Sequence, residues 1–241
     1  SYGGTTTVDI NGPFMIDSRK LAERLYGRDL ATPLATRLDK LGARLLFAQP
    51  YGYFSFYGTN KRELGAPADF AGLKIRAMER LQIMKAKAIN AKPEQISGGE
   101  QYIAYQKGTV DIAQTGANSF VARKLYEIFK YGLSVRDNLM MGLTIINKKT
   151  WASLTPDQQN VITTASAKAF AASWDKMEQD EDASIKLLGE KMTVHAMTAA
   201  ELESWRKTFF PLNQTLLDTT GPAAKELYAI ILKARQEEKL P

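Results

Sequence analysis

Residues 69–76 read DFAGLKIR and place one arginine, Arg76, at the end of a short apolar run. A turn-like segment precedes this run and a helical pattern follows it, so we predict a strand with Arg76 near its carboxyl end. Open α/β sheets bind ligands at such ends. A guanidinium is permanently charged, and its planar fork of donors matches the two oxygens of a carboxylate. The alternative for this arginine, taken alone, is a surface ion pair.

The composition limits the kinds of function that the chain can have. Its 241 residues are 44% hydrophobic, enough for a sizeable core in one large domain or two modest ones. The net charge is +6, but the 32 basic and 26 acidic residues are interspersed, with no run of five like charges. This distribution argues against nucleic acid as a partner. Because the chain has no cysteine, disulfides, thiolate metal sites and a cysteine nucleophile are excluded.

Predicted strands and helices alternate along the chain. Apolar runs at 44–49, 110–114 and 139–146 are typical of strands. Between residues 17 and 42, leucines recur at helical spacing, and a glycine and a proline divide this pattern into two helices or one broken helix. The alternation predicts the α/β class.

Two segments have the spacing of helix-capping boxes. They are residues 97–100 and 155–158, so we predict that helices start at both. The second helix has Pro156 at its first position and keeps an apolar periodicity as far as Gly189. About 35 residues of helix would measure about 50 Å, long enough to bridge two lobes. We interpret the acidic run at 178–182 as a solvated face rather than a metal site, because consecutive helical positions point in different directions.

An aromatic cluster follows the first predicted strand. If the segment is extended, Tyr51, Tyr53 and Tyr57 lie on one face, and Phe54 and Phe56 lie on the other. These rings are expected either to line a cleft or to pack the core of a lobe.

Several segments match one protein family in order and spacing. Residues 69–76 resemble its DLKGLKIR motif, and residues 99–111, GEQYIAYQKGTVD, resemble GEVYTALQTGVVD. Residues 124–128, KLYEI, resemble KFYEV, and residues 147–159 resemble the segment that enters a long helix. With a further likeness at residues 13–15, the similarity covers most of the chain. The family comprises the DctP-like solute-binding proteins of tripartite ATP-independent periplasmic (TRAP) transporters.

The resemblance implies two α/β lobes, joined by strands and a long helix, that close around a carboxylate. The chain would be a periplasmic receptor, expected as a monomer without a cofactor, that delivers an organic acid to the membrane subunits of a TRAP transporter. Arg76 matches the family arginine that forms the carboxylate salt bridge. The predicted ligand site, which has no catalytic residue and no metal, comprises Arg76, Thr115, Ser97, Tyr51, Tyr53 and Asn118.

The chain departs from the family pattern in two places. Thr115 stands where the family has an asparagine, so a hydroxyl replaces a side-chain amide. Together with the aromatic cluster, this change favours an acid with an apolar or aromatic body. Family members also have a longer stretch of chain before the likeness at residues 13–15. Either the given sequence omits such a portion, or the first lobe is incomplete. In the second case a strand around Val8 and Ile10 is expected to cover its exposed edge.

The lobes are predicted to be discontinuous in sequence. The helix at 155–189 is expected to bridge them. The amino-terminal lobe is predicted to comprise residues 1–72, about 139–180 and part of the carboxyl-terminal segment, and the carboxyl-terminal lobe residues 73–138 and about 190–215.

The main alternative is an enzyme, a hydrolase or lyase that acts on a small organic acid or sugar on a similar α/β scaffold. The chain has one histidine, His195, which we interpret as structural because it lies in a short apolar strand. It has no Gly-x-Ser-x-Gly motif and no phosphate-binding glycine loop. A pair of carboxylates for glycoside chemistry is defined by separation in space, so the sequence leaves that possibility open.

Overall fold

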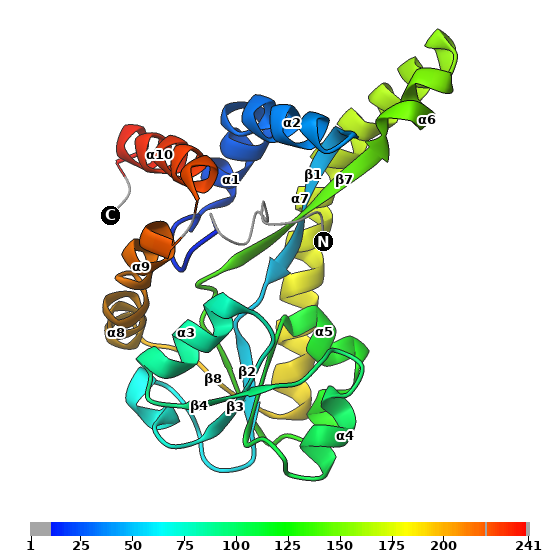
Figure 1. Ribbon diagram of the computed structural model, residues 1–241. Helices are drawn as coiled ribbons and strands as arrows, with labels where there is room; N and C mark the ends of the chain where they lie inside the picture. Colours follow the sequence, from blue (N-terminus) through cyan, green and yellow to red (C-terminus); the bar gives the residue numbers. More distant parts are fainter. Residues whose placement is uncertain (1–10, 220, 240–241) are drawn as a thin grey trace.

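Two sheets organise the molecule (Figure 1), whose computed structural model describes residues 11–219 and 221–239. One is a two-stranded antiparallel ribbon of β1 (Ala43–Tyr53) and β7 (Leu139–Asn147). The other is a mixed sheet in the order β4-β3-β5-β2-β6-β8. Its strands are β2 (Phe56–Thr59), β3 (Lys74–Ala77), β4 (Lys92–Gln95), β5 (Ile112–Thr115), β6 (Tyr131–Ser134) and β8 (Thr193–His195). The α/β class is confirmed.

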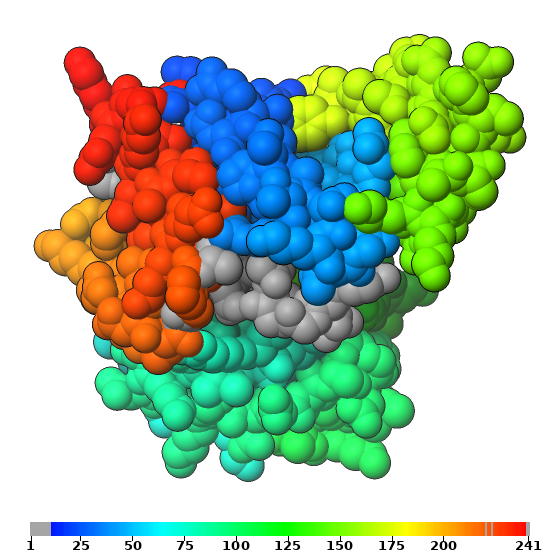
Figure 2. Space-filling view, turned by 45° about the horizontal axis from the view of Figure 1, so that its top comes forward, coloured from blue at the N-terminus to red at the C-terminus, as the bar shows by residue number. Residues whose placement is uncertain are grey.

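Helices surround both sheets. Beside the ribbon lie α1 (Arg19–Arg24), a π-helical turn (Leu25–Asp29), α2 (Ala31–Lys40) and α10 (Pro222–Glu237). Around the six-stranded sheet lie η3 (Pro67–Phe70), α3 (Arg80–Ala88), α4 (Gln101–Gln106), α5 (Ala117–Ala122), η4 (Leu125–Glu127) and α8 (Ala199–Phe209), with α9 (Leu212–Thr219) leading to α10. The short α6 (Lys148–Ser153) and the first turns of α7 (Pro156–Lys191) project from the body (Figures 1 and 2).

The long helix α7 starts as the sequence predicts. The Thr155 side chain accepts from the backbone N–H of Gln158, the Gln158 side chain accepts from the backbone N–H of Thr155, and Pro156 occupies the first helical position. With 36 residues, the helix is about 54 Å long. It contacts β1 of the ribbon at one end, and it contacts β8 of the mixed sheet and the helix α5 towards the other end. The helix therefore spans the two sheets (Figure 1).

Three groups of buried apolar side chains hold these layers together. The first lies between the ribbon and α1, α2, α7 and α10, and Trp174 of α7 is fully buried in it. The other two cover opposite faces of the six-stranded sheet. The neighbouring residues Phe56 and Tyr57 of β2 point to these two faces, as alternation along a strand requires. Both rings therefore pack the core.

A buried ion pair lies where the chain passes from the mixed sheet to the ribbon. Lys85 of α3 and Asp137, between β6 and β7, are 2% and 0% exposed, and Lys85 Nζ lies 2.7 Å from Asp137 Oδ2. The ammonium also lies 5.1 Å from the centre of the Phe209 ring. With its charge paired and its stem packed, this lysine ties α3 to the connection between the sheets.

One expectation about the elements is wrong. The helix expected at 97–100 begins later, because the Ser97 hydroxyl donates to the Glu100 carboxylate instead of accepting from its backbone N–H, and Glu100 is the N-cap of α4. The strand expected at 139–146 does form, as β7, and it lies in the two-stranded ribbon.

The predicted lobe boundaries stay predictions. Residues 56–59, which the prediction assigns to the same lobe as β1, form β2, and β2 pairs with β5 and β6 in the mixed sheet. The strand expected around Val8 and Ile10 lies outside the described residues. Within 11–219 and 221–239, none of the helices combines the length and hydropathy that crossing a membrane requires.

Candidate functional site

Arg76 lies in the interior of the mixed sheet, on β3, and is 2% exposed. Its Nε donates to the carbonyl of Ile96 at 3.0 Å, its Nη1 donates to the carbonyl of Gln114 at 2.7 Å, and its Nη2 contacts the sulfur of Met78. None of the described carboxylates pairs with it. Burial lowers the pKa of Arg76, the nearby Tyr105 opposes this effect, and the positive charge of Arg123 adds to it. Arg76 is therefore a buried cation without an anionic partner among the residues described.

Thr115 ends the strand next to Arg76. β3 and β5 run parallel, with Ile75 opposite Ile112, so Thr115 lies just beyond Arg76 at the same end of the sheet. Thr115 is 2% exposed. The structure thus brings these two predicted site residues to the carboxyl ends of neighbouring parallel strands, where open α/β sheets bind ligands.

Ser97 lies on the loop that follows β4, near Arg76 but exposed to solvent. Its hydroxyl is already engaged with the Glu100 carboxylate at 2.7 Å. The guanidinium of Arg123 lies beside this loop, because its Nη2 is 3.6 Å from the point that a Cβ on Gly98 would occupy. Arg123, the C-cap residue of α5, thus brings a second positive charge close to Arg76.

The remaining predicted residues, Tyr51, Tyr53 and Asn118, line a small cavity of about 60 Å³. Tyr51 is 60% exposed at the rim, whereas Tyr53 is half-buried beneath Arg136, whose guanidinium carbon lies 5.1 Å from the ring centre. Burial raises the pKa of Tyr53. The aromatic cluster is thus divided: two tyrosines line a cavity, while Phe56 and Tyr57 pack the core.

The sequence interpretation missed Glu181, which lines the same cavity from α7. This side chain is 1% exposed, so the reading of residues 178–182 as a solvated face is wrong at that position. A signal for it exists in the sequence, because residues 174, 177, 181, 184 and 188 follow helical spacing on one buried face of α7. Glu181 is the acidic member of that stripe. Burial raises its pKa to about 7, Arg136 opposes the shift, and Asp182 adds to it.

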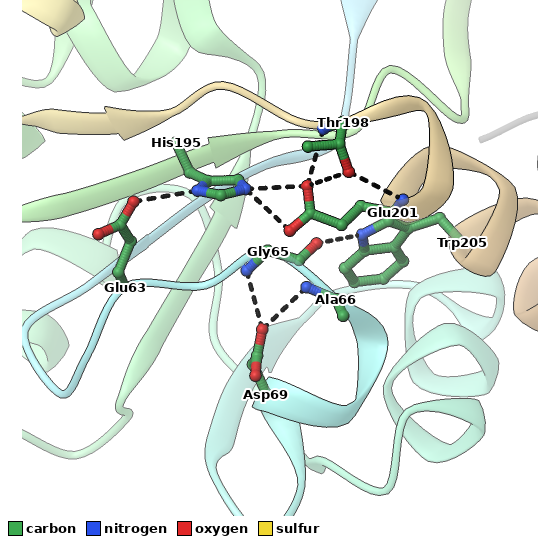
Figure 3. Close-up of polar contacts among 8 residues, drawn as sticks. All are labelled: Glu63, Gly65, Ala66, Asp69, His195, Thr198, Glu201 and Trp205. Carbon is green, nitrogen blue, oxygen red and sulfur yellow. Dashed lines mark hydrogen bonds and ion pairs between the residues drawn. The ribbon is translucent and has the colours of Figure 1, made fainter.

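His195 belongs to a separate polar network at the start of α8 (Figure 3). Its Nδ1 lies 3.0 Å from Glu63 Oε1, and its Nε2 lies 3.0 Å from Glu201 Oε1. Glu201 also accepts from the backbone N–H of Thr198, and the pKa of Glu201 falls to about 2 through that bond and the histidine. Because its ring nitrogens are both engaged, His195 has the contacts of a structural residue that ties β8 to α8.

The same network fixes the loop before η3 (Figure 3). Trp205 Nε1 donates to the carbonyl of Gly65 at 2.7 Å. Asp69 Oδ2 accepts from the backbone N–H groups of Gly65 and Ala66 at 2.9 and 2.8 Å. Asp69, which opens the stretch of sequence that ends at Arg76, thus holds the turn that precedes β3. Within the described part of the chain, no group of three histidines and carboxylates could hold a metal ion.

Comparison with protein families identifies the group to which this architecture belongs. The family model described as bacterial extracellular solute-binding protein, family 7 (DctP) matches residues 4–219. The chain belongs to this family. Among curated relatives, the C4-dicarboxylate-binding periplasmic protein DctP of Rhodobacter capsulatus is 25% identical over 166 residues, 66% of this chain and 48% of that protein. The sialic acid-binding periplasmic protein SiaP of Vibrio cholerae is 26% identical over 174 residues, 71% of this chain and 54% of that protein.

Solved structures of TRAP solute-binding proteins share the fold. One from Desulfovibrio salexigens with bound orotic acid aligns with a TM-score of 0.84 at 22% identity, covering 95% of this chain and 74% of that one. DctP7 of Bordetella pertussis, which binds pyroglutamic acid, aligns at 0.81 and 21%, covering 92% of this chain and 73% of that one. The two-lobed α/β fold is confirmed. Family members are solute receptors rather than enzymes, so a hydrolase or lyase gains no support. The chain spans 35–55% of the length of these and other curated relatives that it matches.

Proposed function

We propose that this family member is an extracytoplasmic receptor that binds a small organic acid between its lobes through Arg76. The observation that carries the proposal is a guanidinium 2% exposed, at the carboxyl end of a strand, with no acidic partner among the described residues. A buried charge without a counter-ion is costly, and a ligand carboxylate would supply that counter-ion.

The contacts of Arg76 leave room for such a ligand. A guanidinium has five N–H donors, and the three contacts of Arg76 engage one donor on each nitrogen. The contact with the Met78 sulfur is a weak one, since a thioether is a poor acceptor. The donors that remain can meet the two oxygens of a carboxylate, while the bonds to Ile96 and Gln114 hold the fork in place.

The other residues are proposed to orient the acid. Thr115 offers a hydroxyl beside Arg76, and Ser97 offers a second hydroxyl on the loop after β4. Tyr51, Tyr53 and Asn118 lie where the body of the acid would extend, which favours an acid with an apolar or aromatic part. Closure of the two lobes around the ligand would exclude water and strengthen the ion pair.

We infer the cellular location and the partner of this protein from its family. The DctP and SiaP relatives are periplasmic binding proteins, and the structural neighbours are TRAP solute-binding proteins. We therefore propose that the receptor works in the periplasm and passes its acid to the membrane subunits of a TRAP transporter. A net charge of +6 would assist capture of an anion.

The test is a thermal-shift screen against small mono- and dicarboxylates, aliphatic and aromatic. A ligand at 100 times its Kd adds about 2.7 kcal/mol to the stability of the native state. For a chain of this size, we expect the Tm to rise by roughly 5–10 °C with one class of acid. If no acid shifts the Tm, the proposal is wrong.

Variants of Arg76 then test the assigned contact. Arg76→Ala should weaken binding of the acid by about two to four orders of magnitude, the value of two charge-assisted hydrogen bonds. Arg76→Lys keeps the charge but loses the fork, so it should weaken binding about tenfold or more. Arg28, which is 69% exposed, provides the control as Arg28→Lys. Affinity within twofold of the wild type in both Arg76 variants would remove Arg76 from the site.

A further inference from the structure

A buried carboxylate without a hydrogen-bond partner faces the cavity that the two tyrosines line. Glu181 is 1% exposed, and no donor in the described structure reaches its Oε2. On the buried face of α7 its neighbours Trp174, Met177 and Leu188 are apolar, and the hydroxyl of Ser184 makes no hydrogen bond to its Oε2. An ionised acid in such a place costs stability unless a donor satisfies it, so its presence requires a reason.

A second unpartnered acceptor comes from another element. Asn118 of α5 lines the same cavity, and its Oδ1 also lacks a donor. The amide nitrogen of Asn118 lies on the Glu181 side, since Nδ2 is 3.7 Å from the point that a Cβ on Gly52 would occupy, and its oxygen still needs a donor. The Glu181 carboxylate and the Asn118 amide thus line a space of about 60 Å³, which is large enough for a water molecule or a small donor group.

The backbone leaves this space open. Gly52 has φ of +109°, and a Cβ added there would lie 3.2 Å from Glu181 Oε2 and 3.7 Å from Asn118 Nδ2. A side chain at residue 52 would be strained and would also occupy the gap between the Glu181 carboxylate and the Asn118 amide. Glycine at this position therefore keeps the cavity free for another molecule.

The cavity adjoins the proposed carboxylate site. Gly116 is one of its lining residues and stands two positions after Gln114, whose carbonyl accepts from Arg76. Two residues of chain span at most about 7 Å, so a small acid held by Arg76 can reach the mouth of this cavity.

We propose that Glu181 and Asn118 form a second subsite, which receives a hydroxyl or ammonium group carried by the acid that Arg76 holds. This inference rests on the proposed receptor function and narrows it to hydroxy and amino acids. Both groups in the subsite can accept hydrogen bonds, and one can be anionic, so the subsite selects a donor and favours a cationic one. Burial of Glu181 opposes its ionisation until such a donor arrives, and the raised pKa agrees with that.

The experiment compares acids that differ only by the donor. One matched set is butyrate, 2-hydroxybutyrate and 2-aminobutyrate, and the other is 3-phenylpropionate, 3-phenyllactate and phenylalanine. Calorimetry at pH 8 measures the affinity of the wild type for each acid. In the set that binds more tightly, we expect the hydroxy or amino acid to bind at least tenfold more tightly than its parent acid. Glu181→Met should abolish this preference and leave the affinity for the parent acid within threefold.

Two further variants separate recognition from folding. Glu181→Gln keeps the shape of the side chain and should lose most of the preference for the amino acid, because its amide carries no charge. Glu190→Gln, at an exposed position on α7, is the control and should leave every affinity unchanged. Circular dichroism checks that each variant is folded.

The outcomes distinguish the subsite from the receptor function. If parent acids bind and respond to Arg76→Lys, but a hydroxyl or ammonium group adds nothing, the subsite is refuted and the receptor proposal stands. If the wild type and Glu181→Met bind each acid with the same affinity, the cavity holds only water and the subsite is refuted. If no acid of either set or of the wider screen binds, the receptor proposal fails and the subsite fails with it.

Discussion

Replacement of Glu181 by glutamine should stabilise the ligand-free protein, by an amount that depends on pH. Burial raises the pKa of this carboxyl from 4.5 to about 7, against the attraction of Arg136 and with the repulsion of Asp182. The native state therefore resists ionisation of a group that ionises readily in the unfolded chain. Glutamine has nearly the same shape and no charge, so it removes this penalty.

The size and sign of the effect follow from the two pKa values. The shift is 7 − 4.5 = 2.5, and each pKa unit corresponds to 1.36 kcal/mol, so the penalty at full ionisation is about 3 kcal/mol. Below pH 4.5 both states hold the proton and the penalty is absent. Between pH 4.5 and 7 the unfolded state releases it first, so the free energy of unfolding of the wild type falls as the pH rises. Above pH 7 the penalty is complete and constant.

Thermal and urea melts at pH 5, 6, 7 and 8.5 measure this difference. The advantage of Glu181→Gln should grow from less than 1 kcal/mol at pH 5 to about 3 kcal/mol at pH 8.5, or roughly 6–12 °C in Tm. Glu190→Gln, on the exposed side of the same helix, should show no such growth. An advantage that is the same at all four pH values would refute the reasoning, and so would destabilisation by glutamine.

Three other perturbations probe paired charges and close contacts around the mixed sheet. Asp137→Ala leaves the ammonium of Lys85 buried and unpaired and should cost about 3–5 kcal/mol in urea melts, whereas changing both to apolar residues should recover much of the loss. The two glutamate partners raise the pKa of His195, so the stability lost in His195→Gln should be greatest below pH 6.5 and should shrink as the pH rises through the raised pKa. Thermal melts from pH 5.5 to 9 measure this loss, and a loss that is the same at every pH would contradict the reasoning. Gly65→Ala should lower the Tm, because the new Cβ would overlap a carboxylate oxygen and lie 2.9 Å from His195 Nε2, while Gly99→Ala, with nothing within 4 Å, should leave the Tm within a degree or two.

Helix boundaries were predictable from the sequence because their causes are local. The capping box at Thr155 involves side chains three residues apart and forms as the spacing predicts, and Thr198 and Glu201 form another with the same spacing. The segment at Ser97 has the same spacing, but its hydroxyl donates to the carboxylate of Glu100, an alternative equally local that letters alone do not distinguish. Arg76 was placed at a strand end by the same kind of local pattern.

The arrangement of the strands and the burial of individual charges could not be predicted from local sequence and became known only from the folded structure. β2 pairs with β5 and β6, which lie far along the chain, and no local pattern specifies that order. Glu181 stands in a run of acidic residues, and only the packing of α7 against β1 and α5 determines which of them faces inward. The buried stripe along α7 carried that information, but the charge of its neighbours concealed it.

Buried charged residues of this molecule fall into two kinds, those that have a charged partner within the protein and those that do not. We infer that the first kind is structural and that the second kind contacts the ligand. Lys85 has Asp137, and His195 has two glutamates, so each charge is satisfied without any ligand. Arg76 and Glu181 are buried just as deeply as the lysine, yet neither has an oppositely charged partner among the described residues. Arg76 lies near the carboxyl end of β3, Glu181 lies on α7, and the two side chains can carry charges of opposite sign. A single hydroxy or amino acid, with its carboxylate on Arg76 and its donor on Glu181, would satisfy both groups, and we propose this as the reason that both are buried.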